Sequence, residues 1–176
     1  MEIPSSPDPV DEPQAYQQHL LGLLGDDDPA AVQTSSPSAW RELVEDAGDL
    51  VAARPIPGEW SVVECLGHAV HAEIVMSGRY RWVLAQDEPP LIGYDQDRWV
   101  ERLAPAQEPP EALLLVLERL RVANVELWRR TPEDRRARVG LHAERGPESY
   151  DLAFRMIAGH DRFHMAQARR ALAALG

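Results

Sequence analysis

The sequence contains no lysine, so all 18 of its basic residues are arginines. The absence of lysine excludes Walker-type phosphate-binding loops and enzymes that form a Schiff base through a lysine, including those that use pyridoxal phosphate. Basic residues are also outnumbered by 29 acidic ones, which gives a net charge of -11. Because a negative surface is repelled by nucleic acid and by anionic lipid, we expect neither nucleic acid nor a membrane as a partner.

Cysteine is nearly absent, since Cys65 is the only one. A single cysteine excludes an internal disulfide and a cysteine-rich zinc site, and it favours a reducing compartment. The longest apolar run, residues 112–117, is far shorter than a membrane-spanning helix. The first residues do not combine a basic segment with an apolar one, as a signal peptide does. We therefore expect a soluble cytoplasmic protein in which Cys65 is a buried apolar side chain.

The chain has 176 residues, of which 44% are hydrophobic and 27% charged, and this is the size and composition of one globular domain. Residues 1–13 are rich in proline and in small or acidic residues, which predicts a flexible tail. A short helix is expected over residues 14–24. We assign residues 1–35 to the tail with this short helix, and residues 36–176 to the folded domain.

Apolar residues recur at helical spacing in four long segments that follow the tail. The segments run from the N-cap candidates Ser36 and Ser38 to Val51, from the N-cap Ser61 to about Gln86, from Pro110 to Arg130, and from about Glu148 to Ala174. Residues 91–110 are expected to form a long ordered loop with one helical turn, and residues 139–142 have weak strand character. The predicted fold class is therefore all-α, with the architecture of a four-helix bundle.

The last of these segments has polar residues in the middle of its apolar stripe. At about 100° per residue, His160, His164 and Gln167 lie among the apolar side chains of this helix. Burial of such polar groups without partners costs about 1 to 3 kcal/mol each. Two histidines one helical turn apart can bind one metal ion, and they can equally be core histidines with hydrogen-bond partners. The residues alone leave both interpretations open.

A third metal ligand has several candidates. They are the remaining histidines and two neighbouring groups, namely His19, Glu64, Cys65, His68, His71 and His142. Glu64, His68 and His71 share one helical face, but it is not the strongest apolar face of that helix. Both histidines can therefore also be solvated surface residues, and periodicity does not choose among the candidates.

Residues 160–164 have the spacing of the H-E-x-x-H helix of zinc proteases, but Asp161 stands where that helix carries its glutamate base. Aspartate is shorter by one methylene group, and no downstream ligand completes the motif. A ferritin-like di-iron site needs Glu-x-x-His pairs on two helices, and the sequence has none. Both classes are therefore disfavoured.

Four segments, taken in order, are typical of one family. They are IPGEWSVVECLGHAVHAE at 56–73, LRVANVELWRR at 120–130, LHAERGPESY at 141–150 and IAGHDRFHMAQARR at 157–170. With these segments the chain resembles the DinB-like (YfiT-like) family of metal-binding four-helix bundles. The resemblance covers most of residues 38–175, and the H-D-x-x-H-x-x-Q pattern of the last segment is its most recognisable part.

The resemblance implies a metal site of three histidines, one from the second helix of the bundle and two from the fourth. Carried over residue by residue, it makes His68, His160 and His164 the metal ligands. The candidates for the surroundings of the site are Glu64, His71, Asn124, His142, Asp161 and Gln167. His71 departs from the family pattern, because many members carry an aspartate at this position. Asn124 and Gln167 can also serve only to bridge helices.

Characterised members of the family use the metal to activate low-molecular-weight thiols. The resemblance therefore implies a metal-dependent S-transferase that uses a thiol of the bacillithiol or mycothiol type in detoxification or stress response. Three neutral imidazoles suit one Zn²⁺ or Ni²⁺ and leave an open position on the ion. The expected partners are a small electrophile and the thiol, and the family suggests a homodimer. A metal-dependent hydrolase and a non-catalytic metal-binding stress protein are the alternatives.

Overall fold

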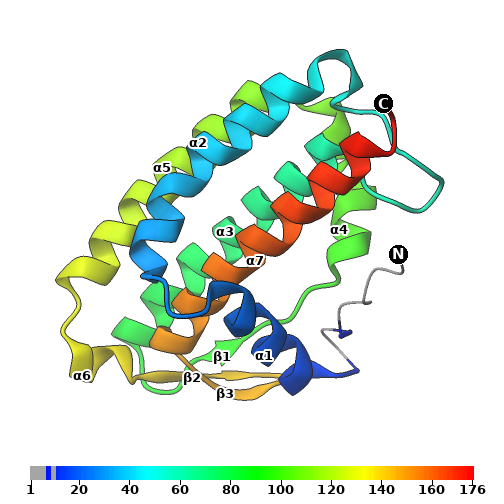
Figure 1. The fold of residues 1–176 in the computed structure, drawn as a ribbon. Helices are drawn as coiled ribbons and strands as arrows, with labels where there is room; N and C mark the ends of the chain where they lie inside the picture. The colour runs from blue at the N-terminus through cyan, green and yellow to red at the C-terminus, as the bar shows by residue number, and fades with distance from the viewer. Residues whose placement is uncertain (1–6, 9–10) are drawn as a thin grey trace.

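The protein is described by a computed structural model that defines residues 7–8 and 11–176 (Figure 1). Its helices are α1 (Pro13–Leu24), α2 (Pro29–Ala47), α3 (Val62–Ala85), α4 (Gln96–Leu103), α5 (Pro110–Arg130), α6 (Glu133–Arg136) and α7 (Tyr150–Ala173), with the short 3-10 helices η1 (Gly48–Leu50) and η2 (Pro105–Gln107). The long helices α2 and α3 each pack against both α5 and α7. This arrangement is the predicted four-helix bundle. Most of the expected flexible tail lies outside the described residues.

A three-stranded sheet covers the end of the bundle where α7 begins (Figure 1). Strand β1 (Pro90–Leu91) pairs in parallel with β2 (Val139–His142), which pairs antiparallel with β3 (Gly146–Ser149). The sequence predicts strand character only for β2, so β1 and β3 are additions to the all-α prediction. Gly140 allows β2 to approach its neighbour, because a Cβ atom there would lie 2.8 Å from Cγ of Leu91.

Helix α2 begins earlier than the sequence predicts. Its N-cap is Asp28, whose side chain accepts hydrogen bonds from two backbone N–H groups of the first turn. The predicted N-caps Ser36 and Ser38 lie inside the helix, together with Pro37. Proline cannot donate to the carbonyl of Gln33, but the hydroxyl of Ser36 donates to this carbonyl at 3.2 Å instead. The division expected after residue 35 falls within α2, and the domain organisation stays a prediction.

The starts of α3 and α5 are where the sequence predicts them. Ser61 caps α3, and Glu64 completes the capping box by accepting from the Ser61 backbone N–H at 2.9 Å. Pro110 occupies the first turn of α5. Helix α7 starts two residues later than predicted, after the N-cap Ser149. Local capping signals therefore determine these boundaries.

The segment before α5 is more ordered than the predicted loop with one helical turn. Helix α4 extends over 8 residues, and Asp95 caps it by accepting from the backbone N–H of Arg98. The helix packs against α3, and Trp99 meets His71 edge-on with 5.8 Å between ring centroids. This segment therefore forms a wall beside the middle of α3.

Helix α1 lies against α7 (Figure 1). The two helices touch at Gly159, where a Cβ atom would lie 1.9 Å from the carbonyl oxygen of Leu20. Arg162 donates hydrogen bonds to the carbonyls of Leu23 and Leu24 and pairs with Asp27. The face of α7 that carries this arginine is therefore covered by α1.

The apolar core divides into two main clusters along the bundle. One is centred on Trp40, Leu66 and Leu117, and the other contains Trp128 stacked on Phe154 at 4.2 Å between ring centroids. A layer of buried polar residues from α3, α5 and α7 lies among these apolar residues. Among the described residues, no helix is long and apolar enough to cross a membrane.

Candidate metal centre

Three histidines from α3 and α7 meet inside the bundle. His68, His160 and His164 are each at most 7% exposed, and one ring nitrogen of each lies within 4.8 Å of those of the others. The closest approach is 2.9 Å, between Nε2 of His68 and Nε2 of His160. The structure thus brings together the three residues that the family resemblance selects. His68, which periodicity left open, is buried.

Hydrogen bonding leaves ring nitrogens of this cluster free. Nδ1 of His164 lies 2.9 Å from Oε1 of Gln167, an oxygen that can only accept, so Nδ1 carries the proton. Nε2 of His164 then has a free lone pair, and it has no hydrogen-bond partner among the described residues. Nδ1 of His68 and Nδ1 of His160 are likewise buried without a partner. His68 and His160 face each other through Nε2, so a cation between the rings would be bound through these two nitrogens and the unpartnered Nε2 of His164.

Burial also sets the protonation of these rings. It lowers the pKa of His68 and His160 well below the usual value, and the neighbouring histidines lower it further. Burial lowers the pKa of His164 to about 4. Near neutral pH all three imidazoles are therefore neutral. Neutral imidazoles are the form in which histidine binds Zn²⁺ or Ni²⁺, so the residues present fit a divalent transition metal.

Trp60 shields the histidine cluster on one side. Its ring lies 5.0 Å from that of His68 and stacks on that of His164 at 5.8 Å between centroids. Trp60 is buried and immediately precedes the N-cap of α3, so the capping box fixes its position. The sequence identifies Trp60 only as the residue that opens this helix. Its place at the start of the family-like W-S-x-x-E segment is the signal that could have marked it.

Two of the predicted neighbours, Asn124 and Asp161, belong to a separate buried network. Arg121 donates from Nη1 and Nη2 to both carboxylate oxygens of Asp161, at 2.5 and 2.9 Å, and its Nε lies 2.8 Å from the carboxylate of Glu73. Asn124 donates to the other oxygen of Glu73 at 2.5 Å. Asp161 is therefore held by an arginine and is not free to act as a base. This pairing is a second difference from the zinc proteases, in which the acidic residue at this position acts as the base.

Glu64 and His71 have other partners as well. The carboxylate of Glu64 binds Arg54 and the backbone and hydroxyl of Ser61, so it serves the start of α3. His71 faces Trp99 of α4. Cys65 lies in the apolar core, and burial raises the pKa of its thiol to about 12, so the thiol is protonated near neutral pH.

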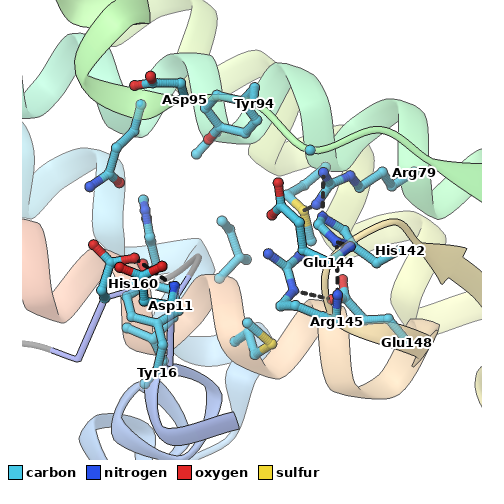
Figure 2. A pocket seen from close by; sticks show the side chains of 18 of the residues that line it. Asp11, Tyr16, Arg79, Tyr94, Asp95, His142, Glu144, Arg145, Glu148 and His160 are labelled. Atoms are coloured by element: carbon cyan, nitrogen blue, oxygen red, sulfur yellow. Dashed lines mark hydrogen bonds and ion pairs between the residues drawn. The ribbon is translucent and has the colours of Figure 1, made fainter. Parts of the chain in front are cut away.

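A cavity of about 360 Å³ extends from His160, the one member of the histidine cluster among its lining residues, to the sheet (Figure 2). His160 lies on its wall at one side, and His142 lies at the other, next to the turn between β2 and β3. Sequence reasoning identified His142 as a candidate for the edge of the site. It missed other residues of the wall, including Tyr16, Arg79, Tyr94 and Arg145. No local motif marks them, because α1, α3 and two loops bring them together.

Fold and site together define a class of protein: an α-helical bundle with a candidate three-histidine metal centre that opens on a small-molecule cavity. The family model described as the DinB superfamily matches residues 34–168. This match covers most of the chain, and the protein therefore belongs to the DinB superfamily.

Two similar proteins agree with this membership. One is a protein of Oceanobacillus iheyensis named "Putative metal-dependent hydrolase OB0413", which is 24% identical to this chain over 115 residues. The match covers 65% of this chain and 66% of the relative, which is just under two thirds of the relative's length. The other is a solved structure, YfiT from Bacillus subtilis, described as "a probable metal-dependent hydrolase with an unusual four-helix bundle topology". It superposes with a TM-score of 0.78 at 20% identity and covers 85% of this chain and 87% of its own. The likeness to YfiT supports the fold.

Proposed function

We propose that the protein is a metal-dependent enzyme whose His68, His160 and His164 hold one divalent transition metal ion, Zn²⁺ or Ni²⁺. The reaction we propose is the transfer of a low-molecular-weight thiol, of the bacillithiol or mycothiol type, to a small electrophile in detoxification or stress response. One observation carries the proposal: three neutral, buried imidazoles with unpartnered nitrogens stand beside a cavity of small-molecule size.

When bound, such an ion supplies a positive charge that lowers the pKa of a thiol or a water molecule. The protein's own residues orient the ligand side chains and shield them from water. Gln167 accepts a hydrogen bond from the Nδ1–H group of His164. This bond directs the opposite nitrogen of the ring toward the centre of the cluster. Trp60 excludes water from the side of the rings that it covers. A thiol activated in this way needs no separate base, which is consistent with the pairing of Asp161 with Arg121.

Hydrolysis is the second candidate, and the names of the two relatives favour it. A hydrolase needs a group that accepts a proton from water. Asp11 and Asp97 line the cavity and are the carboxylates we propose for this role in that case. Burial raises the pKa of Asp97, and the carboxylates of Asp95 and Asp8 raise it further, so Asp97 is a stronger base than an exposed aspartate.

The remaining expectations belong to the same proposal. A cytoplasmic location, a homodimeric state and small-molecule rather than macromolecular partners follow from the family and the composition. The third candidate, a non-catalytic metal-binding stress protein, would use the same three histidines without turnover. It differs from both enzymes in the outcome of activity assays.

The test begins with metal content. Untagged wild-type protein, His164→Ala and the matched control His19→Ala are purified in parallel, and metal per chain is measured by mass spectrometry. We expect close to one transition-metal ion per chain in wild type and in the control, and almost none in His164→Ala. Absence of metal from wild type, even after Zn²⁺ or Ni²⁺ is offered, would contradict the proposal.

Activity assays then distinguish the candidates. The metal-loaded protein is given 1-chloro-2,4-dinitrobenzene with and without a low-molecular-weight thiol, and p-nitrophenyl acetate without thiol. Conjugation that depends on the thiol and on His164 supports the transferase. Hydrolysis that depends on His164 but not on the thiol supports the hydrolase. Loss of neither activity in His164→Ala would overturn both.

A further inference from the structure

Arg79 is a buried cation in the wall of the cavity. It lies in α3 and is only 4% exposed, yet no carboxylate of the described residues forms an ion pair with it. One of its Nη groups donates to the carbonyl of Ile92 at 2.5 Å and lies 3.3 Å from Nε2 of His142. Its Nε is buried without any partner in the described part of the chain. A buried guanidinium without an ion-pair partner is costly unless an anion meets it.

A second arginine reaches into the same space from the turn between β2 and β3. Nε of Arg145 donates to Glu148 at 2.8 Å, while its two Nη groups have no hydrogen bond to the described residues. Burial raises the pKa of Tyr16 and Tyr94 on other parts of the cavity wall, and the charge of Arg145, which lines the same cavity, opposes this rise. The free end of this side chain is therefore directed into the cavity.

The turn that carries Arg145 is held in place by His142. Nδ1 of His142 accepts from the backbone N–H groups of Glu144 and Arg145 at 3.2 and 3.4 Å. The opposite nitrogen of this ring faces Arg79. Because Nδ1 accepts, Nε2 carries the proton of the neutral ring and is a further donor on the wall beside Arg79.

Four charged side chains line this side of the cavity, namely Arg79, Arg145, Glu144 and Glu148. The buried Glu148 pairs with Nε of Arg145 and Glu144 is exposed, so neither carboxylate forms an ion pair with Arg79. Figure 2 shows the two sides of the cavity: Arg79, His142, Arg145 and Glu148 on one, and His160, Asp11, Tyr16 and Asp95 on the other. Acidic groups on the His160 side repel an anion, so a molecule with one negative end is oriented with that end toward the arginines.

We propose that Arg79 and Arg145 form a binding subsite for a carboxylate group of the small molecule that occupies the cavity. This inference rests on the proposed function only in assuming that the cavity is the substrate site. The substrate class is then a small molecule with a carboxylate at one end and a reacting group that extends toward His160. The carboxylate belongs either to the thiol or to the molecule on which the thiol or water acts, and both sources use the same chemistry.

Calorimetric titration of the full chain measures this preference without any activity. N-acetyl-L-alanine and its amide form the first pair of probes, and N-acetyl-L-cysteine and its amide form the second. Hydrogen bonds between arginine and a carboxylate are worth more than those to an amide, so we expect about tenfold tighter binding of each acid than of its amide. Tighter binding of the cysteine acid than of the alanine acid, dependent on metal, assigns the carboxylate to the thiol. Equal binding of the two acids assigns it to the other substrate.

The variants Arg79→Gln and Arg145→Gln keep a donor but remove the charge, and each should reduce the preference for the acid to nearly one. Arg145→Gln alters a turn residue and serves as the test if Arg79→Gln does not fold. The control Arg129→Gln removes the same charge from an exposed position of α5 and should leave the preference unchanged. His164→Ala should retain the preference without metal, which separates failure of the subsite from failure of the metal site. Equal binding of acid and amide by wild type, or no binding of any acid up to millimolar concentration, would overturn the proposal.

Discussion

Two adjacent residues of α7, His160 and Asp161, enter two polar clusters of opposite character. Asp161 belongs to a network in which the guanidinium of Arg121 meets two buried carboxylates and Asn124 meets one of them. His160 belongs to a cluster in which each of three rings has a nitrogen without a partner. Both clusters are buried to the same degree. The first cluster is satisfied by ion pairs within the protein, since Nε of Arg121 and Oε2 of Glu73, which lack an aligned hydrogen bond, lie 2.8 Å apart. The second cluster contains no ion pair and stays unsatisfied.

The satisfied cluster connects the bundle at the level of the site. Arg121 of α5 contacts Glu73 of α3, Asp161 of α7 and the hydroxyl of Ser36 of α2, so all four long helices meet there. Burial alone would lower the pKa of Arg121, but the two carboxylates outweigh burial and raise it above its usual value. The network therefore holds α3 and α7 in the relative position that brings their histidines together.

The largest expected effect comes from breaking this network. Arg121→Met removes the cation and leaves Glu73 and Asp161 buried without compensation, which we expect to lower the free energy of unfolding by about 3 to 5 kcal/mol. Urea denaturation measures the change. The control Arg129→Met, at an exposed ion pair with Glu126, should cost less than about 1 kcal/mol. A loss in Arg121→Met as small as in the control would contradict the structural role of the network.

The unsatisfied cluster should respond to metal instead. At a free concentration about 100 times its dissociation constant, Zn²⁺ should raise the free energy of unfolding of wild type by about 2.7 kcal/mol, because it binds the folded chain. Thermal denaturation with and without Zn²⁺ measures this stabilisation. It should vanish in His164→Ala and persist in His19→Ala. Equal stabilisation of His164→Ala and wild type would show that Zn²⁺ acts elsewhere.

A smaller effect is expected at the hydrogen bond that orients His164. Gln167→Ala removes the acceptor of its Nδ1 proton and should weaken metal binding by about 10-fold to 100-fold, with little change in the stability of the metal-free protein. Gln167→Glu keeps an acceptor and should restore much of the affinity. Competition with a chromogenic chelator gives the dissociation constants, and Gln18→Ala, on an exposed part of α1, is the control. Unchanged affinity in Gln167→Ala would remove this residue from the site.

The smallest effect concerns Glu64, a predicted neighbour of the site that the structure assigns to the capping box. Burial raises the pKa of Glu64, but hydrogen bonds from Arg54 and Ser61 outweigh burial and lower the pKa below the usual 4.5. A lowered pKa in the folded state gives stability above the unfolded pKa that is lost as pH falls through the folded one. Glu64→Gln should therefore cost about 1 kcal/mol near pH 7 and progressively less below about pH 4.5, with metal content unchanged. A pH series of urea denaturations checks this. Loss of metal in the variant would contradict it and would show that Glu64 contributes to the metal site.

Local signals account for most of what the sequence predicts correctly. The capping box at Ser61 and the proline at the start of α5 act within one helical turn, so their positions follow from neighbouring residues. The predicted start of α2 was wrong because Ser36 and Ser38 are residues typical of an N-cap, whereas the N-cap in the structure is Asp28. Only the structure shows that the hydroxyl of Ser36 replaces the backbone donor that Pro37 lacks.

Features that join distant segments could not be predicted in the same way. Pairing of β1 with β2 joins Leu91 to His142 across the whole of α5, and no local pattern encodes that register. The arginines of the cavity are likewise unmarked, because the same residues on a solvated helix or turn would look identical in the sequence. At the site, spacing suggested His160 and His164, and only the family resemblance selected His68. The structure brings the three together, and their role as metal ligands stays a prediction.

X-ray absorption spectroscopy on protein loaded with one equivalent of Zn²⁺ shows directly whether the three histidines bind the ion. We expect three imidazole nitrogens at about 2.0 to 2.1 Å from the ion in wild type, and fewer in His164→Ala. A shell without the histidines, built from carboxylate oxygens or water alone, would contradict this expectation.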